Sequence, residues 1–299
     1  MSNTKTKPRQ NKAAVTAKRL PENPKTFSGS LFTAISLILP TSPPTFERLA
    51  MRHAQGFVLL KENRFDPARF LHTLQHEWGI SPDEGEDITN EDGILNFNVN
   101  GLLCALSLMP APLPDSEAEQ NAAFNYYWPE AVEETAQHQA HILLVVMPIG
   151  ETGATPVDVM ALYSKLACAA LADENSIGIY TSGTVFAPDF YRDVCSSLHE
   201  GELPIPAWIF IGLYGSEEGS SAYTIGLEQF NKMELEILNS EHEPADLHAF
   251  LCSICDYLIS QNITLQDGET IGFSAEEKLA ITRSPAVAGV AEETLKIDY

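Results

Sequence analysis

The sequence predicts an α+β fold in which mainly antiparallel sheets carry helices packed on one face. Three observations lead to this class. Residues 207–238 contain apolar residues at alternate positions, with smaller or aromatic neighbours in the first part, interrupted by a Gly- and Ser-rich run at 215–221, as in a hairpin followed by a third strand. Asn100-Gly101 separates two further strand-like segments, and this dipeptide strongly favours a two-residue hairpin. The predicted helices begin at X-Pro steps and separate strands instead of following one another.

In the first half of the chain, the order of elements is strand, helix, strand, strand, helix, strand. Strands are expected at 31–39, 94–99, 102–109 and 141–147. Helices are expected at 67–78, between a capping Asp66 and Gly79, and from Pro129 to about His138. This order is that of a ferredoxin-like split βαβ unit, so two ferredoxin-like halves packed together are one arrangement consistent with it.

The second half repeats the alternation of helices and strands. Helices are expected to start at Pro156, Pro188 and Pro244, and strands at 177–181, within 207–238, at 279–282 and at 294–297. Apolar residues recur at steps of three and four through 245–260, which predicts an amphipathic helix. We expect residues 207–238 to form the centre of a sheet that this helix covers, with Leu251, Ile254 and Leu258 buried.

Basic residues are concentrated at the start of the chain. Residues 1–26 hold seven of the 18 Lys and Arg and a single acid, with several prolines and no core-forming residues, which predicts a disordered basic tail. Binding of RNA or a weak targeting function are alternatives for this tail. No flexible linker interrupts the remainder, so residues 27–299 are expected to form one compact body with halves at 27–148 and 149–299. No apolar segment predicts a signal peptide or a membrane span, and a cytoplasmic location is expected.

The body of the chain is strongly acidic. The formal charge of the whole chain is −23, from 41 acids and 18 bases, and setting residues 1–26 aside leaves 40 acids against 11 bases, or −29. Such a body repels nucleic acid and anionic membranes, because phosphate binding requires a basic face. A basic protein is the complementary partner, and the alternative is that the charge only keeps the protein soluble.

Several segments resemble a known family. The segments are WPEA at 128–131, HQAHI at 138–142, YTIGLEQF at 223–230, MELEI at 233–237 and DGETIGFSAEEKLAI at 267–281. In order and spacing they are similar to the bacterial family known as domain of unknown function 4261, over roughly residues 100–299. The resemblance implies a bacterial, stand-alone intracellular protein, and it brings no established reaction, cofactor or catalytic residue.

Six residues are candidates for a catalytic or metal site. His138 and His141 have a spacing that places two imidazoles on one metal when both lie on a helix, although a structural role at a helix end is the alternative. Glu234 and Glu236 alternate with apolar residues along a predicted strand, and with Asp267 and Glu269 they are candidates for a carboxylate cluster. Solvated strand and turn faces give the same pattern.

The cysteines indicate packing more than chemistry. Five cysteines in 299 residues are too sparse for a disulfide framework and fit reduced thiols. Cys252 and Cys255 form a C-x-x-C pair, but Cys252 lies two turns inside the predicted helix, away from the N-terminus where a redox thiol is activated. We therefore expect core packing at this pair.

Two functional hypotheses remain from the sequence. The common phosphate, dinucleotide, serine hydrolase and zinc protease motifs are absent, and no cofactor is predicted. The first hypothesis is a non-enzymatic protein that binds a basic partner, as an immunity or accessory factor. The alternative is a hydrolase-like or metal-dependent enzyme that uses His138, His141 and the nearby carboxylates.

Overall fold

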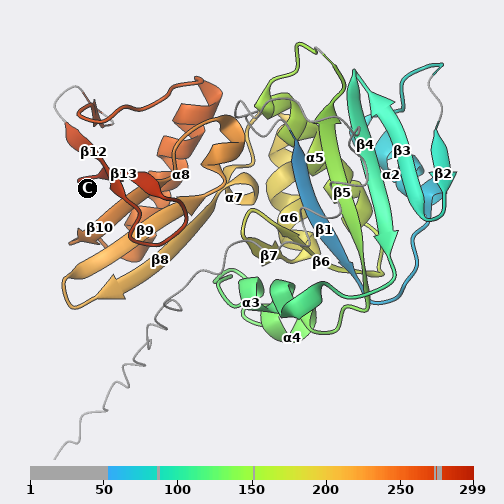
Figure 1. The fold of residues 1–299 in the computed structure, drawn as a ribbon, viewed down its shortest axis with the longest axis horizontal. Helices are drawn as coiled ribbons and strands as arrows, with labels where there is room; N and C mark the ends of the chain where they lie inside the picture. Colours follow the sequence, from blue (N-terminus) through green and yellow to red (C-terminus); the bar gives the residue numbers. More distant parts are fainter. Residues whose placement is uncertain (1–52, 86–87, 151, 273, 275–277) are drawn as a thin grey trace, which may run out of the picture.

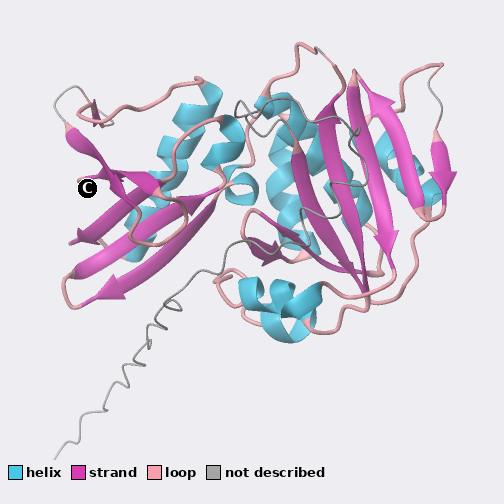
Figure 2. Ribbon diagram, in the orientation of Figure 1, coloured by secondary structure: helices cyan, strands magenta, loops and turns pink. Residues whose placement is uncertain are grey.

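The structure, a computed structural model, describes residues 53–85, 88–150, 152–272, 274 and 278–299. Within these residues, strands form two sheets that lie side by side, and helices pack against each sheet (Figures 1 and 2). The predicted α+β class with mainly antiparallel sheets is confirmed. The predicted strand at 31–39 and the basic tail at 1–26 lie outside the described residues.

The first sheet has seven strands in the order β2-β3-β4-β5-β1-β6-β7, and every neighbouring pair is antiparallel. Its strands are β1 (Ala54–Leu60), β2 (Thr89–Glu91), β3 (Ile94–Val99), β4 (Leu102–Met109), β5 (Ala140–Pro148), β6 (Ser176–Thr181) and β7 (Thr184–Phe186). The central strand β1 therefore lies between two strands that follow it by 80 residues or more. This sheet continues past residue 149, because β6 and β7 extend it on the far side of β1.

The ferredoxin-like arrangement considered for each half is not the topology of this sheet. In a split βαβ unit, the two strands joined by a helix run parallel with one strand between them. Here helix α2 (Pro67–Trp78) connects β1 to the β2–β3 hairpin, and two strands, β5 and β4, separate β1 from β3. The three strands β3, β4 and β5 form a simple antiparallel meander instead.

Helices cover both faces of the first sheet. On one face pack α2, α5 (Pro156–Leu171) and α6 (Pro188–Cys195). On the other face lies a short helical segment formed by η1 (Pro114–Ser116), α3 (Glu117–Ala122) and α4 (Ala131–Thr135). Figure 1 shows this segment at the lower end of the sheet, beside β6 and β7. The helix predicted from Pro129 to about His138 is thus shorter than expected.

The second sheet has six strands in the order β11-β12-β13-β10-β9-β8. Its strands are β8 (Phe210–Ser216), β9 (Gly219–Ile225), β10 (Leu235–Ser240), β11 (Thr270–Ile271), β12 (Leu279–Pro285) and β13 (Glu293–Ile297). All neighbours are antiparallel except β10 and β13, which run parallel. The predicted hairpin is confirmed as β8–β9, but β8 lies at the edge of the sheet, so 207–238 is not its centre.

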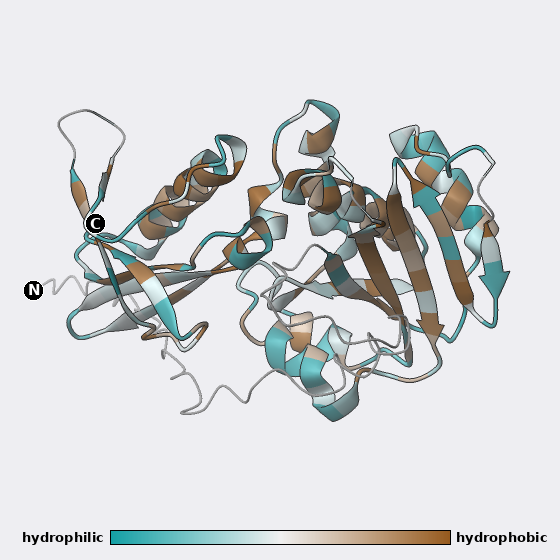
Figure 3. Cartoon of the chain, turned by 45° about the horizontal axis from the view of Figure 1, so that its top comes forward, coloured by the Kyte–Doolittle hydropathy of each residue, from teal (hydrophilic) through white to brown (hydrophobic). Residues whose placement is uncertain are grey.

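Helix α8 (Pro244–Ser260) covers β8 and β9, as predicted for residues 245–260. Leu251, Ile254 and Leu258 are buried, which confirms the predicted apolar face of this helix. Figure 3 shows hydrophobic residues along α8 and, separately, along the inner strands of the first sheet. The core is continuous from one sheet to the other, through α5 and the short helix α7 (Ile205–Trp208). Trp208 donates a hydrogen bond from Nε1 to Ser164 Oγ at 2.8 Å and so joins α7 to α5.

Local sequence rules account for the element ends. Asp66 accepts hydrogen bonds from Ala68 N and Arg69 N at the start of α2, and Gly79 ends the helix with a positive φ of 65°. At the start of α5, the Thr155 hydroxyl and the Asp158 carboxylate form a capping box. Asn100 and Gly101 both have positive φ in the β3–β4 turn, as predicted for this hairpin.

Candidate functional site

The two histidines predicted as metal or catalytic ligands hold backbone in place. His138 is buried, its Nε2 accepts a hydrogen bond from Leu113 N at 2.9 Å, and its Nδ1 bonds to Thr135 O at 2.6 Å. His141 donates from Nδ1 to Ala111 O at 2.8 Å, and burial lowers its pKa. Both rings of His138 and His141 thus fix the loop that leads from β4 into η1. The structural alternative is the one that the geometry supports.

Glu234 is buried, and its carboxylate anchors a turn. It accepts hydrogen bonds from the Thr224 hydroxyl at 2.6 Å, from Gly226 N at 2.8 Å and from Glu228 N at 3.3 Å. These donors lie at the end of β9 and at the start of the short helix η3 (Leu227–Phe230). Burial raises the pKa of Glu234, although the three hydrogen bonds act in the opposite direction.

Glu236 is fully buried on the same side of its strand. It accepts hydrogen bonds from Val287 N at 3.0 Å, Ala288 N at 2.6 Å and Thr294 Oγ1 at 2.7 Å, and it pairs with Lys296 Nζ at 2.9 Å. Burial acts to raise the pKa of Glu236, but these partners outweigh it and the pKa is lowered. The expectation that Glu234 and Glu236 lie on a solvated strand face is therefore wrong, because loops cover that face and bind both carboxylates.

The six candidate residues do not form one cluster. Asp267 accepts a hydrogen bond from Arg283 N and Glu269 accepts one from Gln266 N, so each binds backbone close to its own turn. In the part of the chain that the structure describes, no group of three or more His, Cys, Asp or Glu is arranged to hold a metal ion. The carboxylates at 234 and 236 each bind their own loop, and His138 and His141 belong to the first sheet.

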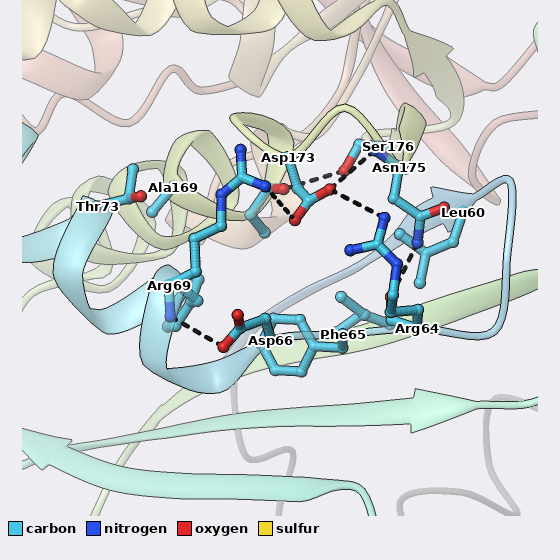
Figure 4. Close-up of a pocket in the computed structure, with 13 residues that line it drawn as sticks. Leu60, Arg64, Phe65, Asp66, Arg69, Thr73, Ala169, Asp173, Asn175 and Ser176 are labelled. Atoms are coloured by element: carbon cyan, nitrogen blue, oxygen red, sulfur yellow. Dashed lines mark hydrogen bonds and ion pairs between the residues drawn. The ribbon is translucent and has the colours of Figure 1, made fainter.

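Two hollows in the described part of the chain are candidate ligand sites. The first, of about 10 Å³, has room for about one water molecule. Figure 4 shows why it is filled: Arg64 and Arg69 both point at Asp173. The ion pairs, at 3.9 and 3.3 Å, connect the β1–α2 loop and the first turn of α2 to the turn before β6. Asn175 completes this connection through hydrogen bonds to Glu62 and Arg64. The arrangement is structural.

The second hollow, of about 290 Å³, lies at the N-terminus of α5 and includes residues of η3 and the turn after it. The capping box already uses Thr155 and Asp158 at this helix end. Among the residues that the structure describes, no Lys or Arg lines the hollow, and burial lowers the pKa of His53 in its wall. The described part of the wall therefore offers no fixed positive charge to an anion.

A different feature stands out on the surface of the first sheet's helical segment. Among the described residues, four aromatic side chains are exposed, and three of them are Phe124, Tyr126 and Tyr127. Val132 on α4 is exposed close to them in sequence. We call Phe124, Tyr126, Tyr127 and Val132 the 124–132 surface.

The loop that carries the 124–132 surface is firmly held. The buried Asn125 donates from Nδ2 to Val185 O at 2.6 Å and accepts from Tyr127 N at 2.7 Å. The Tyr126 hydroxyl donates to Ile211 O at 2.8 Å, on the edge strand β8 of the second sheet. The loop therefore binds both sheets at once.

Tyr127 extends this connection to α8. Its ring stacks on Phe190 at a centroid distance of 4.8 Å, and its hydroxyl is 2.5 Å from His248 Nε2. Burial raises the pKa of Tyr127 and lowers that of His248, so both are neutral at neutral pH and share one hydrogen.

The Cys252 sulfur lies 3.8 Å from both ring nitrogens of His248. Burial raises the pKa of Cys252 to about 11, so this thiol is not an activated nucleophile. Cys255 is buried in the core, as predicted.

Acidic residues flank the 124–132 surface in the sequence. Between Arg69 and Lys165 the chain has 15 Asp and Glu and no Lys or Arg. Six of these acids lie in the helical segment: Asp115, Glu117, Glu119, Glu130, Glu133 and Glu134. Within the described chain, Glu119 alone among these six lies within ion-pair distance of a basic group, the ring of His138. The other five have no ion-pair partner among the described basic residues.

Sequence reasoning did not single out this surface. The sequence signal for this surface is a run of aromatic residues, FNYYW at 124–128, inside a segment rich in acids. Such a run is also typical of a core segment, and Trp128, which packs under the loop, does behave as one. Only the turn around Asn125 decides which rings face outward.

Part of the chain is similar to a known family. A family model described as a domain of unknown function (DUF4261) matches residues 223–298, from β9 to β13. The resemblance is thus confirmed over the segments at 223, 233 and 267, whereas those at 128 and 138 lie outside the match. No curated protein and no solved structure matches the chain. Among the described residues, no helix has both the length and the apolar character needed to cross a bilayer.

Proposed function

We propose that this chain is a cytoplasmic bacterial protein that acts by binding a basic protein partner, as an immunity or accessory factor. The observation that carries the proposal is the distribution of charge: residues 70–164 contain 15 acids and no Lys or Arg. Acidic groups on one region of a surface accelerate and orient association with a cationic partner. They contribute little to the stability of the fold.

The geometry of the six candidate residues supports this function over the enzyme alternative. His138 uses both ring nitrogens to bind backbone, and Glu234 and Glu236 are enclosed by their own loops. A general acid or base needs a free position toward a substrate. His138, Glu234 and Glu236 use their polar atoms to hold loops in place, which leaves these three poorly suited to such a role.

A pull-down from the native bacterium tests the proposal. The full chain serves as bait at low and at raised salt, and the neighbouring genes are inspected for a basic toxin or effector. We expect one dominant basic partner, with slower association as salt screens charges beyond a Debye length of about 8 Å at physiological ionic strength. Recovery of no basic partner at low salt, together with turnover of a small molecule by the pure protein, favours the enzyme instead.

A further inference from the structure

We propose that the 124–132 surface is the contact site and that its occupant is an arginine-rich segment of the partner. This inference rests on the proposed function and adds to it the surface and the side chain that is recognised. It is carried by exposed aromatic residues whose neighbours in the sequence are acidic.

The rings of Tyr126 and Tyr127 contact each other and remain partly exposed, and an exposed aromatic face can bind a guanidinium group. The rings of Tyr126 and Tyr127 lie 4.4 Å apart and are inclined by 49°, and both side chains are exposed, by 42% and 38%. Arginine stacks on tyrosine faces through cation–π attraction, and its guanidinium loses less hydration than an ammonium group does. The surface therefore favours Arg over Lys.

The loop is organised before any partner binds. Asn125 fixes the turn, and the hydroxyls of Tyr126 and Tyr127 are bound to β8 and α8. Side chains that are already held lose little conformational freedom in a complex, and this raises affinity. Rigid tyrosines of this kind are frequent at the centre of protein interfaces.

The charges around the rings select the occupant. Glu130, Glu133 and Glu134 are exposed beside Val132 on and before α4, and no described basic group pairs with them. An acidic protein or a nucleic acid is repelled from such a surface. A second copy of this chain placed with the same surface against itself brings acids against acids. A cationic segment can bind the rings through cation–π attraction and can form ion pairs with the acids.

The experiment is a calorimetric titration of the full-length chain with a short arginine-rich peptide at low salt, and with the lysine peptide of equal length. One test variant is Phe124→Ser/Val132→Ser, which keeps every charge and every hydrogen bond of the loop. Its matched control is Tyr257→Ser/Val287→Ser, two exposed apolar side chains elsewhere. A second test variant is Glu130→Gln/Glu133→Gln/Glu134→Gln. Its control is Glu200→Gln/Glu202→Gln/Glu217→Gln, which removes the same charge from other exposed positions.

We expect the wild-type chain to bind the arginine peptide more tightly than the lysine peptide. Both test variants should bind it about tenfold more weakly, and both controls should change affinity less than about threefold. Circular dichroism of each variant confirms that it is folded.

Three results count against the inference, and they are distinguishable. If the wild-type chain binds neither peptide at low salt, both the proposed function and the surface fail. If test and control variants bind equally, the acidic body binds cations without this surface, and only the inference fails. A full-length variant with the seven Lys and Arg of residues 1–26 replaced by Gln is titrated in parallel. If only that variant binds, the occupant is the chain's own basic segment and a separate partner is overturned.

Discussion

Lys296 and Glu236 face each other across two parallel strands, with Nζ and the carboxylate 2.9 Å apart. Glu236 is fully buried, and it also binds the backbone of residues 287 and 288. One carboxylate therefore joins β10, β13 and the loop that precedes β13. This connection lies inside the region that matches the family model.

Replacing Lys296 by Met should lower the free energy of unfolding by about 3 kcal/mol, because Glu236 is left charged and buried without its counter-ion. The double variant Glu236→Gln/Lys296→Met should cost less than the sum of the two single changes, since it leaves no unpaired charge. Urea unfolding followed by circular dichroism measures all four proteins. If the losses in unfolding free energy of the two single variants add up to that of the double variant, Glu236 and Lys296 do not stabilise each other.

Glu234 and Glu236 should give stability opposite dependences on pH. The pKa of Glu236 is lowered in the folded state, so its contribution is present above the ordinary carboxyl pKa and is lost as pH falls through the lowered value. The pKa of Glu234 is raised, so stability falls as pH increases from the ordinary carboxyl pKa through the raised one.

The variants Glu234→Gln and Glu236→Gln separate these two effects. Urea unfolding over a series of pH values should show that Glu234→Gln flattens the decline above the ordinary carboxyl pKa. Glu236→Gln should flatten the loss of stability on the acid side instead. If both variants change the same side of the profile, the assignment of the two shifts is incorrect.

Gly226→Ala should destabilise the fold more than Gly268→Ala. Both glycines have positive φ, 124° and 83°, which costs an alanine about 1 kcal/mol or more at each position. At Gly226 an added Cβ lies 2.4 Å from Trp208 O, whereas at Gly268 nothing lies within 4 Å. Thermal unfolding of the two variants checks the difference, and equal costs would mean that the contact with Trp208 is relieved by a small shift.

Asn125→Ala should loosen the 123–128 loop. The change leaves Val185 O and Tyr127 N without their partner and should cost about 2 kcal/mol, because the first of these hydrogen bonds is buried and the second is partly buried. Asn121→Ala is the matched control, since the Asn121 side chain binds only Glu117 O within its own helix. Amide hydrogen exchange should become faster at 123–128 in the first variant only. Affinity for the arginine peptide should fall with it.

Local patterns were enough to predict most elements of this fold. The caps at Asp66 and Thr155, the Asn100-Gly101 turn and the apolar stripe of α8 all act within a few residues, so the sequence around each one determines it. The order of strands was not predictable in this way. β1 pairs with β5 and β6 through contacts between residues far apart in the sequence, and no local pattern encodes that choice.

The surroundings of the site candidates were not predictable for a related reason. Alternation at 233–237 correctly places Glu234 and Glu236 on the face opposite Leu235 and Ile237, but it cannot tell water from a covering loop. The loop at 287–288 comes from another part of the chain and encloses Glu236. Likewise, the exposure of Tyr126 and Tyr127 depends on how Asn125 binds β7.

The central position of β1 has a consequence for synthesis on the ribosome. Both neighbours of this strand emerge later, since β5 ends at Pro148 and β6 at Thr181. Until then the apolar residues Phe57 to Leu60 have neither edge paired and no sheet around them. Pairing across such separations is slow, because the entropy of closing the loop must be lost before the contacts form. The nascent chain is therefore open to chaperone binding or aggregation until more than half of it has been made.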